Sequence, residues 1–131
     1  MNRFALLIAA SLIVGGCNSV AAATPDSQKP AHCLAAIQYT NSWLRQGGKQ
    51  ELMMNGAARS VFVLKKIQAS EMSLEAAKAD ATALIKAYGN DPERMNALAM
   101  ECLAAQDRDP QFSAQLPALL ALVRANPQLA N

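Results

Sequence analysis

The sequence has few of the residues that build β-sheets. Aromatic residues make up 5% of the 131 residues, and much of the 52% hydrophobic fraction is alanine. Strands favour β-branched and aromatic side chains, whereas alanine, leucine and methionine favour helices. We therefore expect an all-α protein. About 110 residues remain beyond the N-terminal segment, enough for one domain with a modest core.

Neither sign of charge is in large excess. The formal net charge is +2, and Lys65-Lys66 is the only pair of adjacent basic residues. Proteins that bind nucleic acid usually carry a strongly basic face. Nucleic acid is therefore not an expected partner.

The residues that carry most enzyme chemistry are also scarce. His32 is the only histidine, and the sequence has neither a glycine-rich phosphate loop nor a Cys-x-x-Cys-His haem site. A hydrolase triad needs a positioned base, and a metal site needs several ligands. We expect His32 to be a solvent-exposed polar residue, and Asp107 and Asp109 to be solvated or capping. We expect no catalytic residue, no metal and no cofactor.

The N-terminus has the order of a secretory signal peptide. Asn2 and Arg3 precede an apolar run of eleven residues, 4–14. That run is too short to span a bilayer as a helix of the mature protein, and it is typical of a leader that is removed on export.

Two cleavage sites follow this run. Val14-Gly15-Gly16-Cys17 resembles the lipobox of bacterial lipoproteins, although leucine is commoner than valine at its first position. The resemblance implies that residues 1–16 are removed and that Cys17 carries acyl chains. Ala21-Ala22-Ala23 resembles an ordinary A-x-A site, which would remove residues 1–23 instead.

We favour the lipobox because Cys17 lies close behind the apolar run. Residues 17–29 are mostly small and polar, as expected of a flexible tether. The chain would then contact the bilayer through its N-terminal acyl chains. Asn18 replaces the aspartate typical of inner-membrane retention, which favours an outer-membrane anchor facing the periplasm. Cleavage after Ala23 would give a soluble periplasmic or secreted protein.

The cysteine count supports a disulfide. The three cysteines are Cys17, Cys33 and Cys102, an awkward odd number for an exported protein. Cleavage at the lipobox would leave Cys17 acylated, and cleavage at the A-x-A site would remove it with the leader. In both cases only Cys33 and Cys102 remain as free thiols able to pair. We therefore predict a Cys33–Cys102 disulfide. No Cys-x-x-Cys motif is present, so a redox role for the pair is not expected.

Helix start and stop signals divide residues 30–131, the expected helical domain. They predict helices over 30–46, 50–68, 74–88 and 92–106, the last two opened by Ser73 and by Asp91-Pro92. Gly56, inside the second, either permits close helix contact or marks a break. A fifth helical region opens at Asp109-Pro110, and Pro117 either starts its helix or kinks it.

The short connections predict a small up-and-down bundle of four to five helices cross-linked by one disulfide. In that topology the start of helix 30–46 and the end of helix 92–106 lie at the same end. Cys33 and Cys102 are then able to meet.

The last helical region is more apolar than a single buried stripe requires. Excess apolar surface on a terminal helix indicates either a partner or complete cover by the rest of the domain. We predict that four residues face a partner, either an unknown protein or a second copy in a homodimer: Leu116, Leu119, Leu120 and Val123.

These features predict a non-catalytic envelope lipoprotein that acts by protein–protein interaction. The alternative is a soluble periplasmic helical chaperone or an inhibitor- or immunity-like binding module. In size, class and cysteine pair the chain is similar to acid-stress chaperones and immunity proteins of the bacterial envelope. That similarity is an analogy and assigns no residue.

Overall fold

The computed structural model describes residues 24–130, and within them the chain is entirely helical, without strands. The predicted all-α class with five helices is confirmed. Cys17, the signal peptide and tether residues 17–23 lie outside the described residues. The elements are α2 (Pro30–Gln46), α3 (Gln50–Ala69), α4 (Leu74–Tyr88), α5 (Pro92–Asp107), α6 (Pro110–Ala125) and the short 3-10 helix η1 (Pro127–Ala130).

Three helices begin at the caps that the sequence indicates. The Ser73 hydroxyl accepts a hydrogen bond from the Ala76 N–H at 3.1 Å, and the Asp91 carboxylate accepts one from Arg94 N–H at 3.1 Å. Asp109 caps α6 in the same way. Each cap satisfies a backbone donor that the first turn of a helix leaves free.

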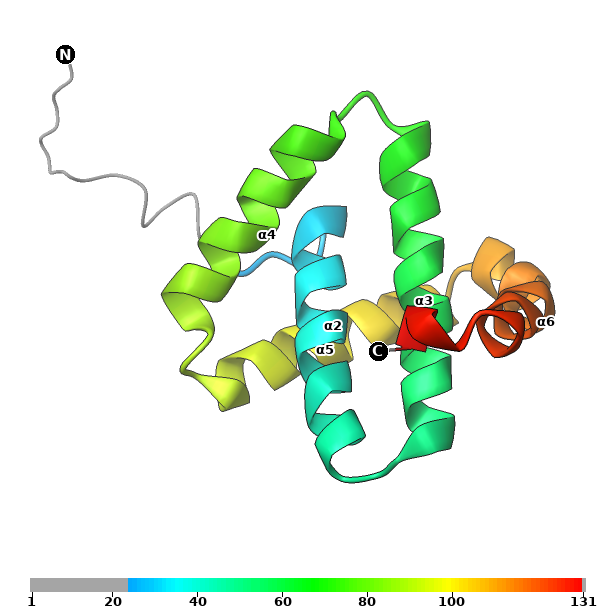
Figure 1. Cartoon of the computed structure of the whole chain (residues 1–131). Coiled ribbons are helices and arrows are strands. Elements are labelled where there is room, and N and C mark those ends of the chain that lie inside the picture. The colour runs from blue at the N-terminus through cyan, green and yellow to red at the C-terminus, as the bar shows by residue number, and fades with distance from the viewer. Residues whose placement is uncertain (1–23, 131) are drawn as a thin grey trace, which may run out of the picture.

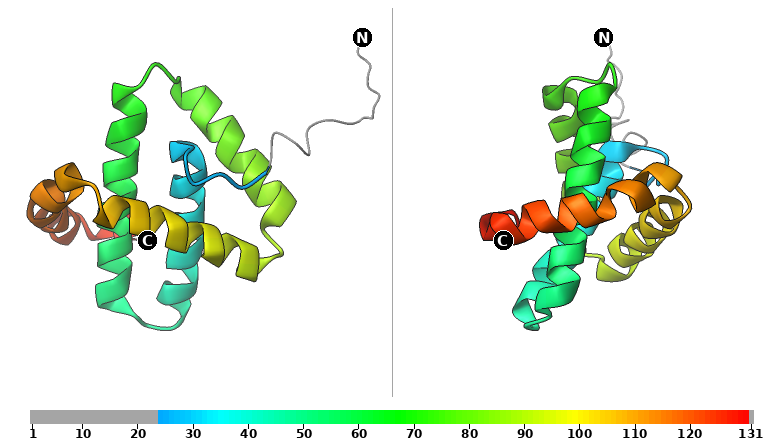
Figure 2. Two further views of the ribbon diagram at one scale, coloured as in Figure 1. Left: turned by 180° about the vertical axis from the view of Figure 1, so that it is seen from behind. Right: turned by 90° about the vertical axis from the view of Figure 1, so that its right-hand side faces the viewer.

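The helices are arranged around an antiparallel hairpin formed by α2 and α3 (Figure 1). Helix α4 packs on α2, and α6 packs on α3. Helix α5 crosses the back of the hairpin in Figure 1 and is seen in front of it in the reversed view (Figure 2, left), so it is less parallel to its neighbours than in a regular up-and-down bundle.

The hydrophobic core has two parts. The larger cluster joins α2 to α4, α5 and the second half of α3, with Ile37, Leu84 and Met95 at its centre. The smaller cluster lies between α3 and α6, where the Phe62 and Phe112 rings meet edge to face at 5.2 Å between centroids. Helix α6 therefore has a core of its own, separate from the one that holds α4 and α5.

Pro117 lies inside α6, which runs unbroken from Pro110 to Ala125. Of the two predicted possibilities, the single helix is correct. Proline removes the N–H that would bond to the carbonyl of Ser113, four residues earlier. Ser113 and Pro117 are both exposed, so water is able to bond to that carbonyl instead.

Gly56 permits close contact between α2 and α3. The Asn41 side chain donates a hydrogen bond from Nδ2 to the Met53 carbonyl at 3.0 Å, across the hairpin. A Cβ on Gly56 would overlap the Asn41 amide. Helix α3 continues through Gly56, so the alternative of a helix break is excluded.

We expect Gly56→Ala to lower the free energy of unfolding by about 1 kcal/mol. Overpacking against Asn41 outweighs the gain of about 1 kcal/mol in helix propensity. In an Asn41→Ala background the overlap is gone, so the same substitution should stabilise the protein by about 1 kcal/mol. Urea unfolding of the four chains measures both effects. Equal effects of Gly56→Ala in the two backgrounds would contradict this explanation.

Candidate functional site

Cys33 and Cys102 are brought together by the crossing of α5 over α2. Their sulfur atoms lie 2.09 Å apart, at disulfide distance, and their Cα atoms are 5.6 Å apart. Both side chains are buried. The predicted pair is therefore present, although α5 crosses α2 instead of lying antiparallel to it, as an up-and-down bundle would have it.

His32 is fully buried, and the prediction of an exposed side chain is wrong. Its Nδ1 accepts a hydrogen bond from the Asp26 N–H at 3.2 Å, and its Nε2 has no partner. The cause is a turn before α2, in which Gln28 N–H bonds to the Asp26 carboxylate and Lys29 N–H bonds to the Asp26 carbonyl. Residues 26–29 thus fold back over the start of the helix.

The surroundings of His32 favour its neutral form. Burial lowers the pKa of its imidazole and the Lys29 ammonium lowers it further, whereas Asp80 and Asp26 act in the opposite direction. The start of a helix, where the backbone dipole is positive, also disfavours a cation. Because the side chain has no exposed surface, the only histidine of the chain does not reach a substrate in solution.

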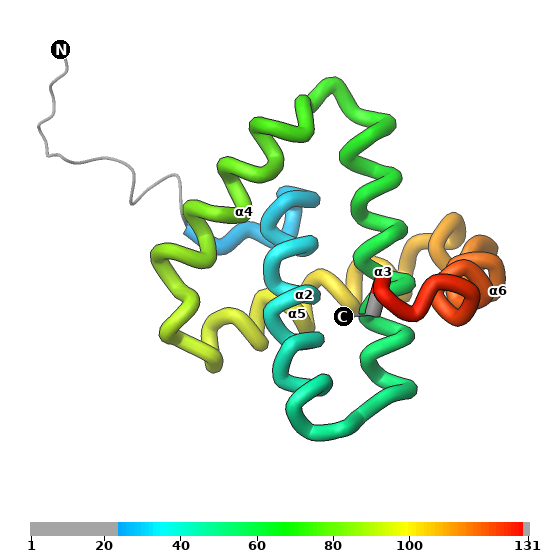
Figure 3. The backbone as a smooth tube through the Cα atoms, viewed as in Figure 1, coloured from blue at the N-terminus to red at the C-terminus, as the bar shows by residue number. Residues whose placement is uncertain are grey.

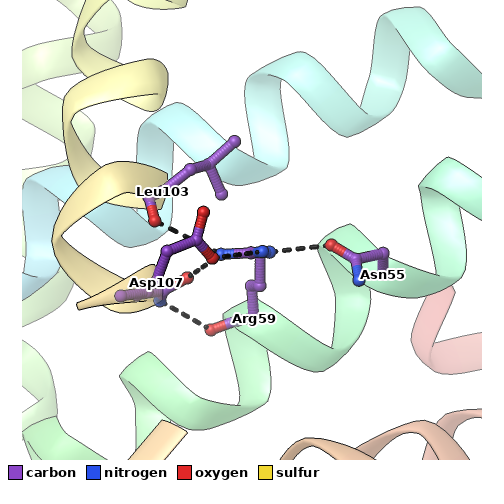
Figure 4. A network of polar contacts seen from close by, with 5 residues as sticks. Asn55, Arg59, Leu103 and Asp107 are labelled. Carbon is purple, nitrogen blue, oxygen red and sulfur yellow. Dashed lines mark hydrogen bonds and ion pairs between the residues drawn. The ribbon is translucent and has the colours of Figure 1, made fainter. Parts of the chain in front are cut away.

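Arg59 forms a polar network that joins α3 to the end of α5 (Figure 4). Its guanidinium donates to Asn55 Oδ1 at 2.7 Å, to the Leu103 carbonyl at 3.4 Å and to the Asp107 carboxylate at 2.8 Å. It also donates to Gln106 Oε1 at 3.2 Å, and the buried Gln106 returns a bond to the Arg59 carbonyl.

The same guanidinium lies over the Phe112 ring of α6, 4.7 Å from its centre. Arg59 therefore contacts three helices, and its donors are used within the fold. Its role is structural. Little in the sequence indicates this role, because the hydrogen bonds to α5 and the contact with Phe112 join residues more than 40 positions apart.

We expect Arg59→Ala to lower the free energy of unfolding by about 2 kcal/mol. The substitution leaves Oε1 of the buried Gln106 without its Arg59 donor and removes the guanidinium from the Phe112 ring. An unsatisfied buried group costs about 1–3 kcal/mol. Asp107→Ala is the control, since its carboxylate is 61% exposed and an exposed ion pair contributes less than about 1 kcal/mol. Urea unfolding measures both variants, and an equal loss in their free energy of unfolding would contradict the structural role of Arg59.

The leucines predicted to face a partner form the packing face of α6. Leu119 and Val123 are 2% and 1% exposed, buried against α3, and Leu116 and Leu120 are partly buried on the same cluster. Leu119 and Val123 are thus covered by the domain itself, which was the alternative explanation of the apolar character of this helix, whereas Leu116 and Leu120 keep part of their surface exposed. Leu122, in contrast, is 42% exposed.

A groove of about 380 Å³ lies between α3 and α6. Its apolar side chains include Phe62, Leu119 and Leu122, and its basic ones are Lys65 and Lys66. We call it the α3–α6 groove. Its full lining is Phe62, Lys65, Lys66, Ala69, Gln111, Gln115, Ala118, Leu119 and Leu122.

The two lysines of the groove differ in their ion pairing. Lys66 Nζ bonds to the Asp109 carboxylate at 2.9 Å and lies 5.2 Å from the centre of the Phe62 ring. That bond and the Gln111 N–H hold the pKa of Asp109 below its usual value. Lys65 makes no ion pair within residues 24–130. The lysine pair is visible in the sequence, but its position beside α6 depends on how the two helices pack.

Other kinds of site find little support in the described part of the chain. Within residues 24–130 no cluster of three or more His, Cys, Asp or Glu side chains is placed to hold a metal ion. No helix in this range is both long enough and apolar enough to cross a membrane. Comparison with known families, curated proteins and solved structures gave no match.

Proposed function

We propose that this chain is a non-catalytic envelope protein that is anchored through acyl chains on Cys17 and acts by binding another protein. The α3–α6 groove is the observation that carries the binding role. It combines an apolar floor, a half-exposed leucine at position 122 and, at position 65, a lysine that forms no ion pair within residues 24–130. The lipobox-like sequence before Cys17 supports the anchor.

The groove suits an amphipathic helix of the partner. Such a helix buries apolar side chains in a groove between helices, and its polar edge lies at the rim. An acidic residue on that edge would pair with Lys65, which lies outside the Lys66–Asp109 pair. The enclosed His32 and the internally bonded Arg59 also favour a binding role over catalysis, since neither presents a reactive group to solvent.

Site-specific photo-crosslinking in cells tests the binding role. A crosslinking residue at position 122 should give a discrete product, and Lys65→Glu should weaken it. The same residue at position 74 is the control, because Leu74 is 53% exposed on α4, outside the groove. A product of twice the monomer mass would identify a second copy as the partner. Equal labelling from positions 122 and 74 would count against the groove.

The intact mass of the protein expressed from its own leader tests the anchor. A mature chain that begins at Cys17 and carries added acyl mass is the expected result. A chain that begins at Thr24 would mean that the protein is released as a soluble periplasmic or secreted form.

A soluble, acid-responsive chaperone is the second candidate, and His32 is the observation that favours it. Protonating an enclosed imidazole at the start of a helix is costly, so acid would loosen the contact between α2 and residues 26–29. A chaperone of this kind should expose apolar surface and bind the dye ANS as the pH falls below 6.5, the ordinary pKa of histidine. No rise in ANS fluorescence above the unfolding pH would count against this candidate.

A further inference from the structure

The end of the α2–α3 hairpin projects beyond the other helices. The last residues of α2, the turn at 47–49 and the first residues of α3 extend past α4 and α5 in both ribbon views, and the backbone tube shows the same projection (Figures 1, 2 and 3). We call residues 43–52 the hairpin tip. Gly48 has a φ of 71°, which allows the tight reversal between the helices.

Large apolar side chains lie on both sides of the hairpin tip. Trp43 is 51% exposed, and its ring packs edge to face on Tyr39, with 6.3 Å between centroids. Leu52 is 56% exposed and borders a cleft between α2, α3 and α5 that Leu44 also lines. Trp43 does not line that cleft, and it lies in the last turn of α2, across the turn from Leu52 in the first turn of α3.

The charge at the hairpin tip is basic. Arg45 and Lys49 are exposed on either side of the glycine pair, and neither forms an ion pair within residues 24–130. Glu51 is the only acidic residue of the hairpin tip. The tip therefore combines an aromatic ring, a leucine and two cations that pair with no acidic residue of the described chain, all on a projecting turn.

We infer that the hairpin tip inserts into the surface of a bilayer that contains anionic lipids. Tryptophan favours the headgroup region because its ring is apolar and its N–H is polar. Lysine and arginine are attracted to anionic headgroups. The interfacial region of a bilayer surrounds a projecting turn, so it is able to cover Trp43 at the end of α2 and Leu52 at the start of α3 together.

The length of the N-terminal tether agrees with this placement, and this step rests on the proposed anchor at Cys17. Residues 17–23 reach about 25 Å when extended, at about 3.5 Å each. Helix α2 has 17 residues and is also about 25 Å long. The tether joins the chain near the start of α2, and the hairpin tip lies at its other end. An anchored domain is therefore able to lay α2 towards the bilayer and bring the tip into contact with it.

Trp43 is the only tryptophan of the chain, so its fluorescence reports on the hairpin tip alone. The test uses a Cys17→Ser chain, which carries no acyl group, and vesicles of phosphatidylcholine with or without phosphatidylglycerol. With phosphatidylglycerol we expect a blue shift of the Trp43 emission and protection from acrylamide. Arg45→Gln and Lys49→Gln should each weaken vesicle binding by about fivefold. Lys78→Gln and Lys86→Gln are the matched controls, since they remove the same charge from α4 and should change binding less.

Two results would overturn the inference. One is an unchanged Trp43 emission with both kinds of vesicle. The other is protection of Trp43 that requires an envelope protein and does not occur on vesicles. The anchor is tested separately, by incorporating the mature wild-type chain into the same vesicles. If the chain is stably incorporated but acrylamide still quenches Trp43, the lipid anchor is supported and insertion of the hairpin tip is rejected. If the Trp43 emission of the Cys17→Ser chain shifts but the wild-type chain carries no acyl mass, insertion of the hairpin tip is supported and the lipid anchor is rejected.

Discussion

Reduction of the Cys33–Cys102 pair should lower the free energy of unfolding by about 4 kcal/mol. The two cysteines are 69 residues apart, and a cross-link that closes a loop of this length removes much of the conformational entropy of the unfolded chain. For a domain that buries only a modest core, this is a large share of the total stability. Urea unfolding with and without dithiothreitol measures the effect.

Cys102→Ser provides the control for this prediction. The variant should be about as unstable as the reduced wild-type protein, and dithiothreitol should not change it further. Alkylation of the native protein should label neither Cys33 nor Cys102 until reductant is added. Two reactive thiols in the untreated, unfolded protein would show that the pair is not bonded.

Acidification should destabilise the protein through His32. The pKa of His32 is lowered in the folded state, whereas in the unfolded chain it lies near 6.5. Between these two values the unfolded chain binds a proton that the folded chain does not. The contribution of His32 to the free energy of unfolding is therefore fully present above pH 6.5. It is lost as the pH falls towards the pKa that His32 has in the folded protein. Its slope is at most about 1.4 kcal/mol per pH unit.

His32→Asn isolates this contribution. Asparagine keeps an acceptor near the position of Nδ1 for the Asp26 N–H, but it does not titrate. We expect the variant to be less stable at neutral pH, because it fills less space, and to show a shallower dependence of stability on pH below 6.5. Parallel pH profiles of the variant and the wild type would exclude His32 as the cause.

The features predicted correctly from the sequence are the local ones. Ser73, Asp91 and Asp109 cap their helices because a cap depends on residues two or three positions away. The cysteine pair followed from counting in an exported chain rather than from geometry. It would have been predicted equally for several arrangements of the helices.

The features that the sequence did not reveal depend on contacts between distant segments. His32 is buried because residues 26–29 turn back over α2, although their composition is typical of a linker. The α6 leucines were assigned to a partner because the sequence does not show that Phe62 and its neighbours on α3 cover them. The groove beside Lys65 exists only once these two helices are packed.

The position of the cysteine pair also divides the chain into two parts that respond differently to proteolysis. Cys33 and Cys102 enclose α3 and α4 in one covalent ring, and α6 lies outside it. A cut at Lys65 or in the turn before α4 therefore leaves a single molecule on a non-reducing gel. A cut after the exposed Arg108 leaves α6 held by non-covalent contacts alone, chiefly its packing on α3, the Lys66–Asp109 ion pair and the contact of Arg59 with Phe112. Of the five α-helices in residues 24–130, α6 is the one that lies wholly outside the ring, so a single cut can separate it without reducing the protein.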